Sequence, residues 1–119
     1  MDYKTGNVTI MVSDFDRAVA FYTQTLGFTL KNRYGNDWAD VSAPGVNIGL
    51  HPDGGHNKSR GEALSIGFEV ADLEQAMQEL GGKGVQFPDG VRVAGYLREA
   101  AFADPDGTPL YLVQMAHGH

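Results

Sequence analysis

Val12-Ser13-Asp14-Phe15-Asp16-Arg17-Ala18 returns later in the chain as Val70-Ala71-Asp72-Leu73-Glu74-Gln75-Ala76, an offset of 58 residues. The similarity extends outward, because Val8 and Ile10 have counterparts in Ile66 and Phe68. A period of about half the chain is too long for a solenoid, whose units are roughly 20 to 50 residues. Two copies of one strand–helix–strands unit therefore predict a pseudosymmetric domain, with a small-molecule cleft where the halves meet.

Composition restricts the functions that the chain can have. Its 119 residues, 42% hydrophobic and 20% charged, predict a single soluble globular domain over 1–119. A net charge of −6 makes nucleic acid and anionic membranes unfavourable partners and favours a cationic ligand. The absence of cysteine excludes a disulfide framework, a thiolate nucleophile and a thiolate-bound zinc. With no signal-like N-terminus and no apolar run of roughly 18 residues, we expect a cytoplasmic protein.

The first half, residues 6–51, is predicted to contain one strand, one helix and three further strands. Residues 7–12 alternate between apolar and more polar positions, as in a strand with one buried face. Ser13 followed by Asp16 is a capping-box pattern, and apolar residues then recur at helical spacing until Gly27. The three further strands are expected at about 28–34, 37–42 and 46–51.

The second half, residues 63–115, repeats this plan after a polar, glycine-rich linker at 52–62. Alternating residues from Leu64 to Val70 predict a strand, and Asp72 is expected to cap a helix that ends at Gly81. Later strands are expected near 84–88, 91–95, 97–103 and 110–115. Residues 116–119 are predicted to be a tail.

Each half is therefore predicted to be a βαβββ module of an α+β fold, with its own helix covering one sheet face. Related by a pseudo-twofold, the two opposite faces would form a curved sheet around a ligand cavity. The positions expected to face this cavity are Asn7, Thr9, Met11, Asn47, Gly49 and His51 in the first half, and Ser65, Gly67, Glu69, Tyr111, Val113 and Met115 in the second.

The motifs of both halves resemble one protein superfamily. Val8-Thr9-Ile10-Met11-Val12-Ser13-Asp14, followed by Ala20-Phe21-Tyr22 and Leu26-Gly27-Phe28, resembles the opening of vicinal-oxygen-chelate proteins. Phe68-Glu69-Val70-Ala71-Asp72-Leu73 and Phe102-Ala103-Asp104-Pro105-Asp106-Gly107 resemble the second-half signatures. This superfamily includes glyoxalase I, extradiol dioxygenases, fosfomycin resistance enzymes and bleomycin-binding proteins. The resemblance implies paired βαβββ modules and a homodimer, but it leaves the chemistry open.

The resemblance also implies where a metal would bind in this chain. Metal-dependent members take ligands from four cavity positions, two of them usually histidine and two often glutamate. The matching positions here are Asn7, Gly49, Ser65 and Tyr111. Glycine has no side chain, and the other three are weak ligands compared with imidazole or carboxylate. We therefore expect no metal at these positions and no other cofactor.

A displaced metal site is an alternative, because other ligand types occur nearby. His51 lies two residues beyond Gly49, and Glu69 lies four residues beyond Ser65, each on the cavity-facing side of its strand. His56 is in the linker. A site needs three convergent ligands, and the sequence brings together one. The pair His117 and His119 is interpreted as tail.

Four further side chains have both a ligand-binding and a structural interpretation. Trp38, the only tryptophan, is either core or a wall on which a flat ligand stacks. His51 is either a hydrogen-bonded strand end or a ligand contact and general base. Tyr96 and Arg98 share a face of a predicted strand, and Arg98 either binds a carboxylate or phosphate or pairs with a surface acid.

These observations lead to three functional hypotheses. The first is a metal-independent binding protein that sequesters an antibiotic or aromatic metabolite, with ligand contacts from Asn7, Met11, Trp38, His51, Ser65, Tyr96, Arg98 and Tyr111. The second is a lyase, isomerase or dioxygenase that uses a displaced divalent metal or acid–base chemistry at His51. The third is a regulatory or immunity-type interaction module, for which no residue argues.

Overall fold

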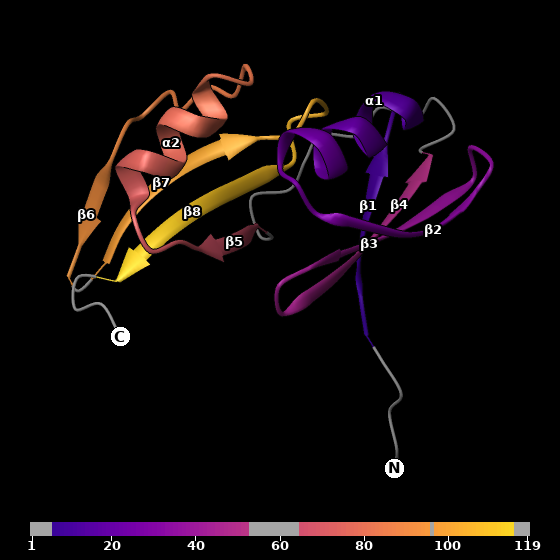
Figure 1. The fold of residues 1–119 in the computed structure, drawn as a ribbon, viewed down its shortest axis with the longest axis horizontal. Coiled ribbons are helices and arrows are strands. Elements are labelled where there is room, and N and C mark those ends of the chain that lie inside the picture. Colours follow the sequence, from indigo (N-terminus) through magenta and orange to yellow (C-terminus); the bar gives the residue numbers. More distant parts are fainter. Residues whose placement is uncertain (1–5, 53–64, 96, 116–119) are drawn as a thin grey trace, which may run out of the picture. The chain divides into compact units, whose positions relative to one another are not determined.

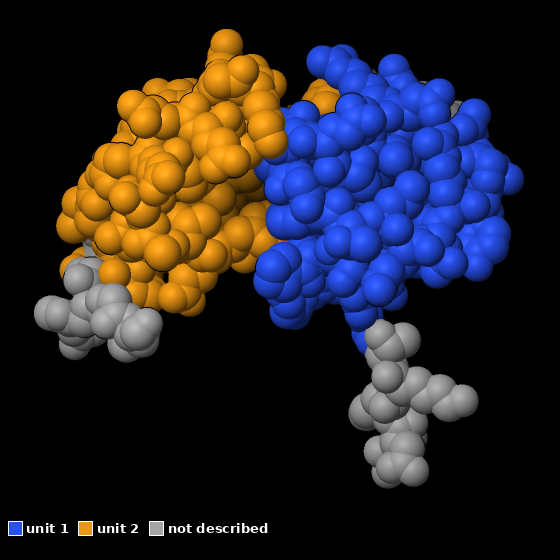
Figure 2. Space-filling model, viewed as in Figure 1, with its two compact units in different colours: residues 1–59 blue, residues 60–119 orange. Residues whose placement is uncertain are grey.

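The chain folds into two compact units, residues 1–59 and 60–119 (Figure 2). The structure is a computed structural model, and it describes residues 6–52, 65–95 and 97–115. Each unit contains one four-stranded sheet with helical structure along one face (Figure 1).

The first unit has the element order that its alternating pattern predicts. Its sheet has the strand order β1-β4-β3-β2, with β1 parallel to β4 and the other pairs antiparallel. A π-helical turn, η1, continues directly from helix α1. The elements are β1 (Val8–Val12), α1 (Phe15–Ala20), η1 (Phe21–Thr25), β2 (Thr29–Tyr34), β3 (Trp38–Ala43) and β4 (Val46–Pro52).

Alternation along the strands determines which face of the first sheet is buried. On β1, Ile10 and Val12 are buried, whereas Met11 between them is 40% exposed. Ala39, Val41 and Ala43 on β3, and Ile48 and Leu50 on β4, are buried in the same way. The buried residues of α1 and η1 that complete this core are Phe15, Ala18, Val19 and Tyr22.

The second unit repeats the topology of the first, with strand order β5-β8-β7-β6 and β5 parallel to β8. Its elements are β5 (Ile66–Glu69), α2 (Leu73–Gly81), β6 (Arg92–Ala94), β7 (Leu97–Ala103) and β8 (Pro109–Met115). Both halves are thus βαβββ modules, and the predicted α+β class is confirmed.

The strand expected near 84–88 is not present, and this prediction was wrong. Gly84 has φ +93°, and the Val85 amide donates to the Leu80 carbonyl at 3.0 Å, so this segment closes the end of α2. Pro88 has no amide hydrogen for a strand ladder. Phe87 instead packs its ring against Phe102, with centroids 5.4 Å apart. Hydrophobic content alone made the segment resemble a strand.

Equivalent aspartates begin the two helices. The carboxylate of Asp14 accepts a hydrogen bond from the Arg17 amide at 3.1 Å, and that of Asp72 accepts one from the Gln75 amide at 3.0 Å. The cap predicted for Asp72 is confirmed, but the capping-box interpretation of Ser13 was wrong. Asp14, in extended conformation, is the residue immediately before the first helical turn, where a side-chain acceptor satisfies otherwise unpaired amides.

Parts of the predicted organisation fall outside the described residues. Of the linker expected at 52–62, only Pro52 is described, as the last residue of β4. His56 and the tail at 116–119, with His117 and His119, also lie outside the description. In the described part of the chain, no helix has the length and apolar character needed to cross a membrane.

Asp72→Ala should lower the free energy of unfolding by about 1 kcal/mol, because the Gln75 amide then loses its acceptor. Asp72→Asn, which retains a side-chain acceptor, should lose much less. Urea unfolding curves of both variants measure the difference. Equal losses for Ala and Asn would contradict a capping role.

Candidate functional site on the polar face of the first sheet

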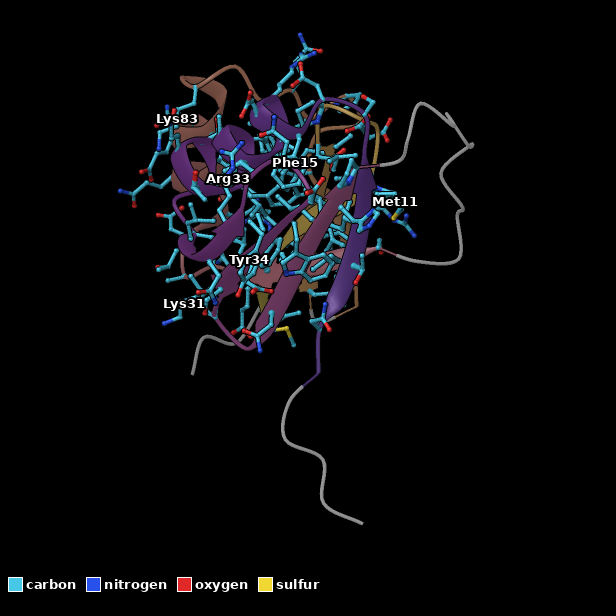
Figure 3. The ribbon with its side chains drawn as sticks, turned by 90° about the vertical axis from the view of Figure 1, so that its right-hand side faces the viewer. Met11, Phe15, Lys31, Arg33, Tyr34 and Lys83 are labelled. Atoms are coloured by element: carbon cyan, nitrogen blue, oxygen red, sulfur yellow. The ribbon has the colours of Figure 1, made fainter. Side chains whose placement is uncertain are left out.

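The first sheet has a second face, opposite α1, that carries polar and aromatic side chains. We call it the polar face. Strand register places its residues together: Thr9 pairs with Gly49, Gly49 with Asp40, and Asp40 with Asn32. Figure 3 shows Met11 projecting from β1, on the opposite side from Phe15 and Arg33. The members of the polar face are Asn7, Thr9, Met11, Asn32, Tyr34, Trp38, Asp40, Ser42, Asn47, Gly49 and His51.

The indole ring of Trp38 lies directly across the backbone of Gly49. A Cβ atom at position 49 would collide with Cη2 of Trp38 and lie 2.5 Å from its Cζ2. The same Cβ atom would lie 2.9 Å from Nδ2 of Asn7. Residue 49 therefore has to be glycine for the ring to rest on the sheet. The side chains of Trp38 and Asn7 meet over the backbone at this position. Since the direct register partner of Gly49 is Asp40, two residues beyond Trp38 on β3, the ring reaches Gly49 diagonally.

Asp40 fixes the orientation of this ring. Its Oδ1 accepts a hydrogen bond from Nε1 of Trp38 at 2.7 Å, and its Oδ2 accepts a longer one from Nδ2 of Asn32 at 3.4 Å. Asp40 and Trp38 are both half-buried. A hydrogen bond to a charged acceptor is stronger than one between neutral groups, so the ring is held at its edge by Asp40 and supported from below by Gly49.

The contact partner of the His51 ring indicates which of its two nitrogens is the hydrogen-bond donor. Its Nδ1 lies 2.7 Å from the carbonyl oxygen of Pro52. Because a carbonyl oxygen only accepts, the proton is on Nδ1, and Nε2 of the neutral ring keeps its lone pair. The imidazole meets the Trp38 ring edge-on, with centroids 6.3 Å apart and an interplanar angle of 70°. His51 thus has an acceptor nitrogen beside the aromatic surface.

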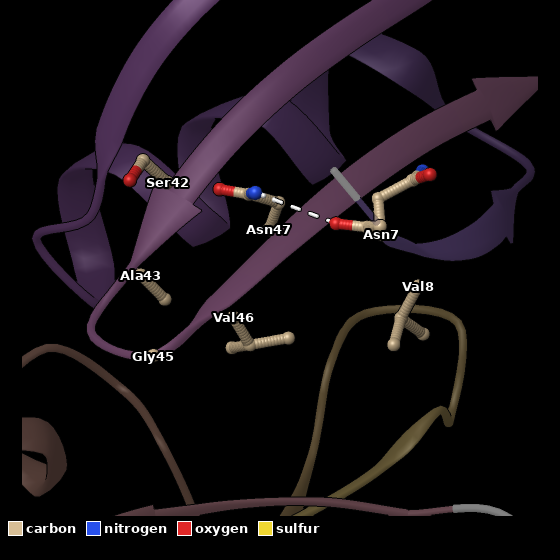
Figure 4. A pocket seen from close by; sticks show the side chains of 8 residues that line it. Asn7, Val8, Ser42, Ala43, Gly45, Val46 and Asn47 are labelled. Atoms are coloured by element: carbon tan, nitrogen blue, oxygen red, sulfur yellow. Dashed lines mark hydrogen bonds between the residues drawn. The ribbon is translucent and has the colours of Figure 1, made fainter. Parts of the chain in front are cut away.

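A shallow pocket of about 480 Å³ lies at the end of the polar face where β1 begins (Figure 4). Its polar side chains are those of Asn7, Ser42 and Asn47. The Asn47 amide donates to the Gly6 carbonyl at 3.4 Å, and the Asn7 amide donates to Oγ1 of Thr9 at 3.2 Å. These amides supply both donors and acceptors but no formal charge.

The second unit contains a related aromatic–glycine contact. A Cβ atom at Gly67 would collide with Cζ and Cε2 of Tyr111 and lie 2.5 Å from its hydroxyl oxygen. Gly67 and Tyr111 are direct register partners on β5 and β8. Ser65 is exposed just before β5, and Glu69 is exposed at its end. Tyr111 therefore covers the sheet of the second unit much as Trp38 covers that of the first.

Arg98 lies on the face of the second sheet that carries α2. Its guanidinium forms an ion pair with Glu74 on that helix, and Nη1 is 3.1 Å from Oε1 of Glu74. Of the two alternatives for Arg98, the structure contains the pairing with an acid, and a ligand contact remains a prediction. Tyr96, its predicted companion, lies outside the described residues.

The residues at the four metal-ligand positions do not fit a divalent cation. Gly49 has no donor atom, and the Trp38 ring occupies the space that a side chain there would need. The Asn7 amide is hydrogen-bonded to Thr9, and Ser65 and Tyr111 offer hydroxyl groups, which bind divalent metals weakly when neutral. Among the described residues there is no cluster of three or more His, Cys, Asp or Glu that could hold a metal.

Of the residues on the polar face, Trp38, His51 and Asn7 are predicted ligand contacts from the sequence, whereas Asp40 is not among those predicted. A usable signal was present, because residues two apart on a strand share a face, so Trp38-x-Asp40 places a carboxylate beside the indole. The diagonal contact with Gly49 has no such signal, since it depends on the register of β3 against β4.

Comparisons with known proteins give a consistent result. The model of the Glyoxalase/Bleomycin resistance protein/Dioxygenase superfamily matches residues 4–112. The chain is 31% identical over 121 residues to the uncharacterized protein YwkD of Bacillus subtilis strain 168, covering 91% of this chain and 94% of that protein. A solved superfamily member from Sphaerobacter thermophilus is 27% identical with a TM-score of 0.76, covering 95% of this chain and 98% of that one. A glyoxalase family protein from Enterococcus faecalis, 22% identical, shares the fold with a TM-score of 0.78, covering 92% and 96%.

Gly49→Ala should displace the indole and lower the free energy of unfolding by about 1–3 kcal/mol, because the added methyl overpacks the contact. Since Trp38 is the only tryptophan, its fluorescence emission should shift as well. Gly6→Ala is the matched control, because a Cβ atom there meets nothing within 4 Å. Unchanged emission in Gly49→Ala would contradict the contact.

The Glu74–Arg98 pair should make stability depend on pH in one direction. The hydrogen bond from Arg98 lowers the pKa of Glu74 below its ordinary 4.5. Its stabilising contribution is therefore complete above about pH 4.5 and is lost as the pH falls through the lowered folded-state pKa. Urea midpoints of the wild type and Glu74→Gln should differ modestly near neutral pH and converge in acid, since the pair is exposed. Glu79→Gln, on the same helix, is the control, and a pH-independent difference would contradict the assignment.

Proposed function

Because the chain belongs to the glyoxalase/bleomycin resistance protein/dioxygenase superfamily, we propose that it binds a flat small molecule without the help of a metal. The observation that carries this proposal is the Trp38 ring, which lies on Gly49 at one of the superfamily's ligand positions. The family model that matches residues 4–112 confirms the resemblance found in the sequence at the level of the superfamily. The binding function is our inference from the residues of the polar face.

A fixed indole is a suitable surface for a planar ligand. Stacked or edge-to-face aromatic pairs contribute about 0.5–1.5 kcal/mol beyond the area that they bury. The hydrogen bond to Asp40 and the contact with Gly49 orient the ring before the ligand arrives. Little side-chain entropy then remains to be lost on binding, which favours affinity.

Polar groups around the ring would give the site its selectivity. Ligand sites in proteins combine an apolar surface with a few oriented polar groups. Here Asn7, Ser42 and Asn47 line the pocket at the start of β1, and His51 lies on the other side of the ring. Met11, 40% exposed on β1, adds an adaptable apolar contact.

We extend the proposal to sequestration of an antibiotic or aromatic metabolite by a homodimer. The superfamily includes bleomycin resistance proteins beside glyoxalases and dioxygenases, and we infer binding without conversion as the role of this chain. Replacement of the ligand positions by Asn, Gly, Ser and Tyr supports such a role, because the chemistry of chelation is lost while the scaffold is kept.

A second candidate is an enzyme that uses His51 as a general base. The contact with Pro52 places the proton on Nδ1, which leaves Nε2 able to take a proton from a ligand. This candidate needs no metal, and it predicts a converted product, whereas a sequestering protein returns its ligand unchanged.

Native mass spectrometry of the purified full chain tests the proposal directly. The variant His117→Ala/His119→Ala should be used, so that tail histidines do not collect metal. We expect a dimer that carries an organic mass and no stoichiometric divalent ion. Trp38→Leu should lose the organic mass, because it removes the stacking surface, whereas Gly81→Ala, at the end of α2 in the second unit, should retain it, because a Cβ atom there meets nothing within 4 Å.

Two results would count against the proposal. One divalent ion per chain would show that metal binds despite the residues at the four ligand positions. Retention of the same organic mass by Trp38→Leu would place the ligand away from the polar face. Chemical analysis of the released molecule then separates binding from turnover.

A further inference from the structure

We propose that the ligand of the polar face is a planar cation, which stacks on Trp38 and directs its charged nitrogen to Asp40. This inference rests on the proposed function and adds to it the charge of the ligand. Three observations support it: the charge of the face, the unused capacity of the Asp40 carboxylate, and the position of that carboxylate at the edge of the ring.

Asp40 is the one carboxylate among the residues that make up the polar face, and no basic side chain of the described residues pairs with it. Arg33, on the neighbouring strand, is directed to the other side of the sheet, where it pairs with Asp16 and lies 5.1 Å from the Phe15 ring centroid. Figure 3 shows Arg33 beside Phe15 and Lys31 projecting outward from the ribbon. Within the described parts of the chain, the face therefore carries a negative charge that has no partner of opposite sign.

The carboxylate of Asp40 has room for further donors. An ionised carboxylate offers about four lone-pair positions. Within the described structure, Trp38 and Asn32 each donate one hydrogen bond to it, the second at a long 3.4 Å. Both donors are neutral, so they orient the carboxylate without neutralising it. Because the residue is half-buried, its charge is screened less than that of a fully exposed acid.

The hydrogen bond to Trp38 also determines where this charge lies. The Nε1–H bond is in the plane of the indole, so its acceptor sits at the ring edge and not above the ring. A ligand ring stacked on the indole then has the carboxylate beside its own edge, where an amidinium or ammonium substituent would meet it. The ring face attracts cations as well, because its quadrupole is negative there. Stacking and ion pairing thus favour the same ligand charge.

The sole tryptophan allows a direct test with matched probes. Benzamidine is flat and cationic, benzamide is its neutral analogue, benzoate its anionic analogue, and cyclohexanecarboxamidine a cation without an aromatic ring. Quenching of Trp38 fluorescence is titrated with each probe at low salt. We expect benzamidine to bind about tenfold more tightly than benzamide, as one hydrogen bond to a charged group predicts. Benzoate and the cyclohexane analogue should bind more weakly than benzamidine.

Two variants of equal charge isolate the role of Asp40. Asp40→Asn keeps a side-chain oxygen for the Trp38 N–H but removes the charge, so the preference for benzamidine over benzamide should disappear. Asp37→Asn removes the same charge from the exposed β2–β3 turn and should keep that preference. The readout is the ratio of two affinities within one variant, so a small displacement of the ring affects both probes alike.

The outcomes separate this inference from the proposed function. Equal binding of benzamidine and benzamide, or an unchanged ratio in Asp40→Asn, overturns the cation inference and leaves the binding function standing. Absence of quenching by all four probes overturns both, because the Trp38 surface then accepts no flat molecule. Stronger binding of benzoate than of benzamidine would reverse the assigned charge.

Discussion

Alternation along the strands of the first sheet sends Val12, Val41 and Leu50 into the core under α1, and Met11, Asp40 and Gly49 to the opposite side. A strand cannot shift by one residue without exchanging these two sets, so the register is fixed by the cost of exposing the buried side chains. The same register aligns Thr9, Gly49 and Asp40 in one row across three strands. Hydrophobic burial on one face thereby positions the polar groups on the other.

Glycine is needed where an aromatic ring rests on the sheet, because any side chain at that position would collide with the ring. Both units use this device, but with different strands. Trp38 on β3 reaches diagonally over Gly49 on β4, whereas Tyr111 on β8 covers its direct partner Gly67 on β5. The two halves share one backbone topology, but their aromatic–glycine contacts use different pairs of strands.

Features of the fold that depend on periodicity could be predicted from the sequence. Features that depend on one tertiary contact could not. The repeat, the alternating faces and the Asp72 cap follow from spacing, and all are present. Segment 84–88 was misjudged because it closes the end of α2 through the Val85 amide and packs Phe87 against Phe102 of β7, without forming a strand ladder. Arg98 was compatible with either of two partners until the placement of α2 brought Glu74 to it. The same holds for the candidate site. Trp38 could be predicted as a candidate from its residue type, but its contact with Gly49 could not, because it depends on the register of β3 against β4.

The proposed metal-free site would distinguish its ligands in a different way from a metal site. A divalent metal selects ligands by their oxygen atoms, and its strong charge outweighs small differences in shape. At an indole held by one carboxylate, stacking and cation–π attraction each contribute on the order of 1 kcal/mol to binding. Selectivity must then come from a ligand whose ring and charge both fit at the same time. Fixing that geometry in advance matters more in such a site than in a metal site, because no single term can compensate for a misplaced ring. Gly49 fixes the Trp38 ring from below, and Asp40 fixes it at its edge through a hydrogen bond. Both contacts hold the ring in one orientation before a ligand binds.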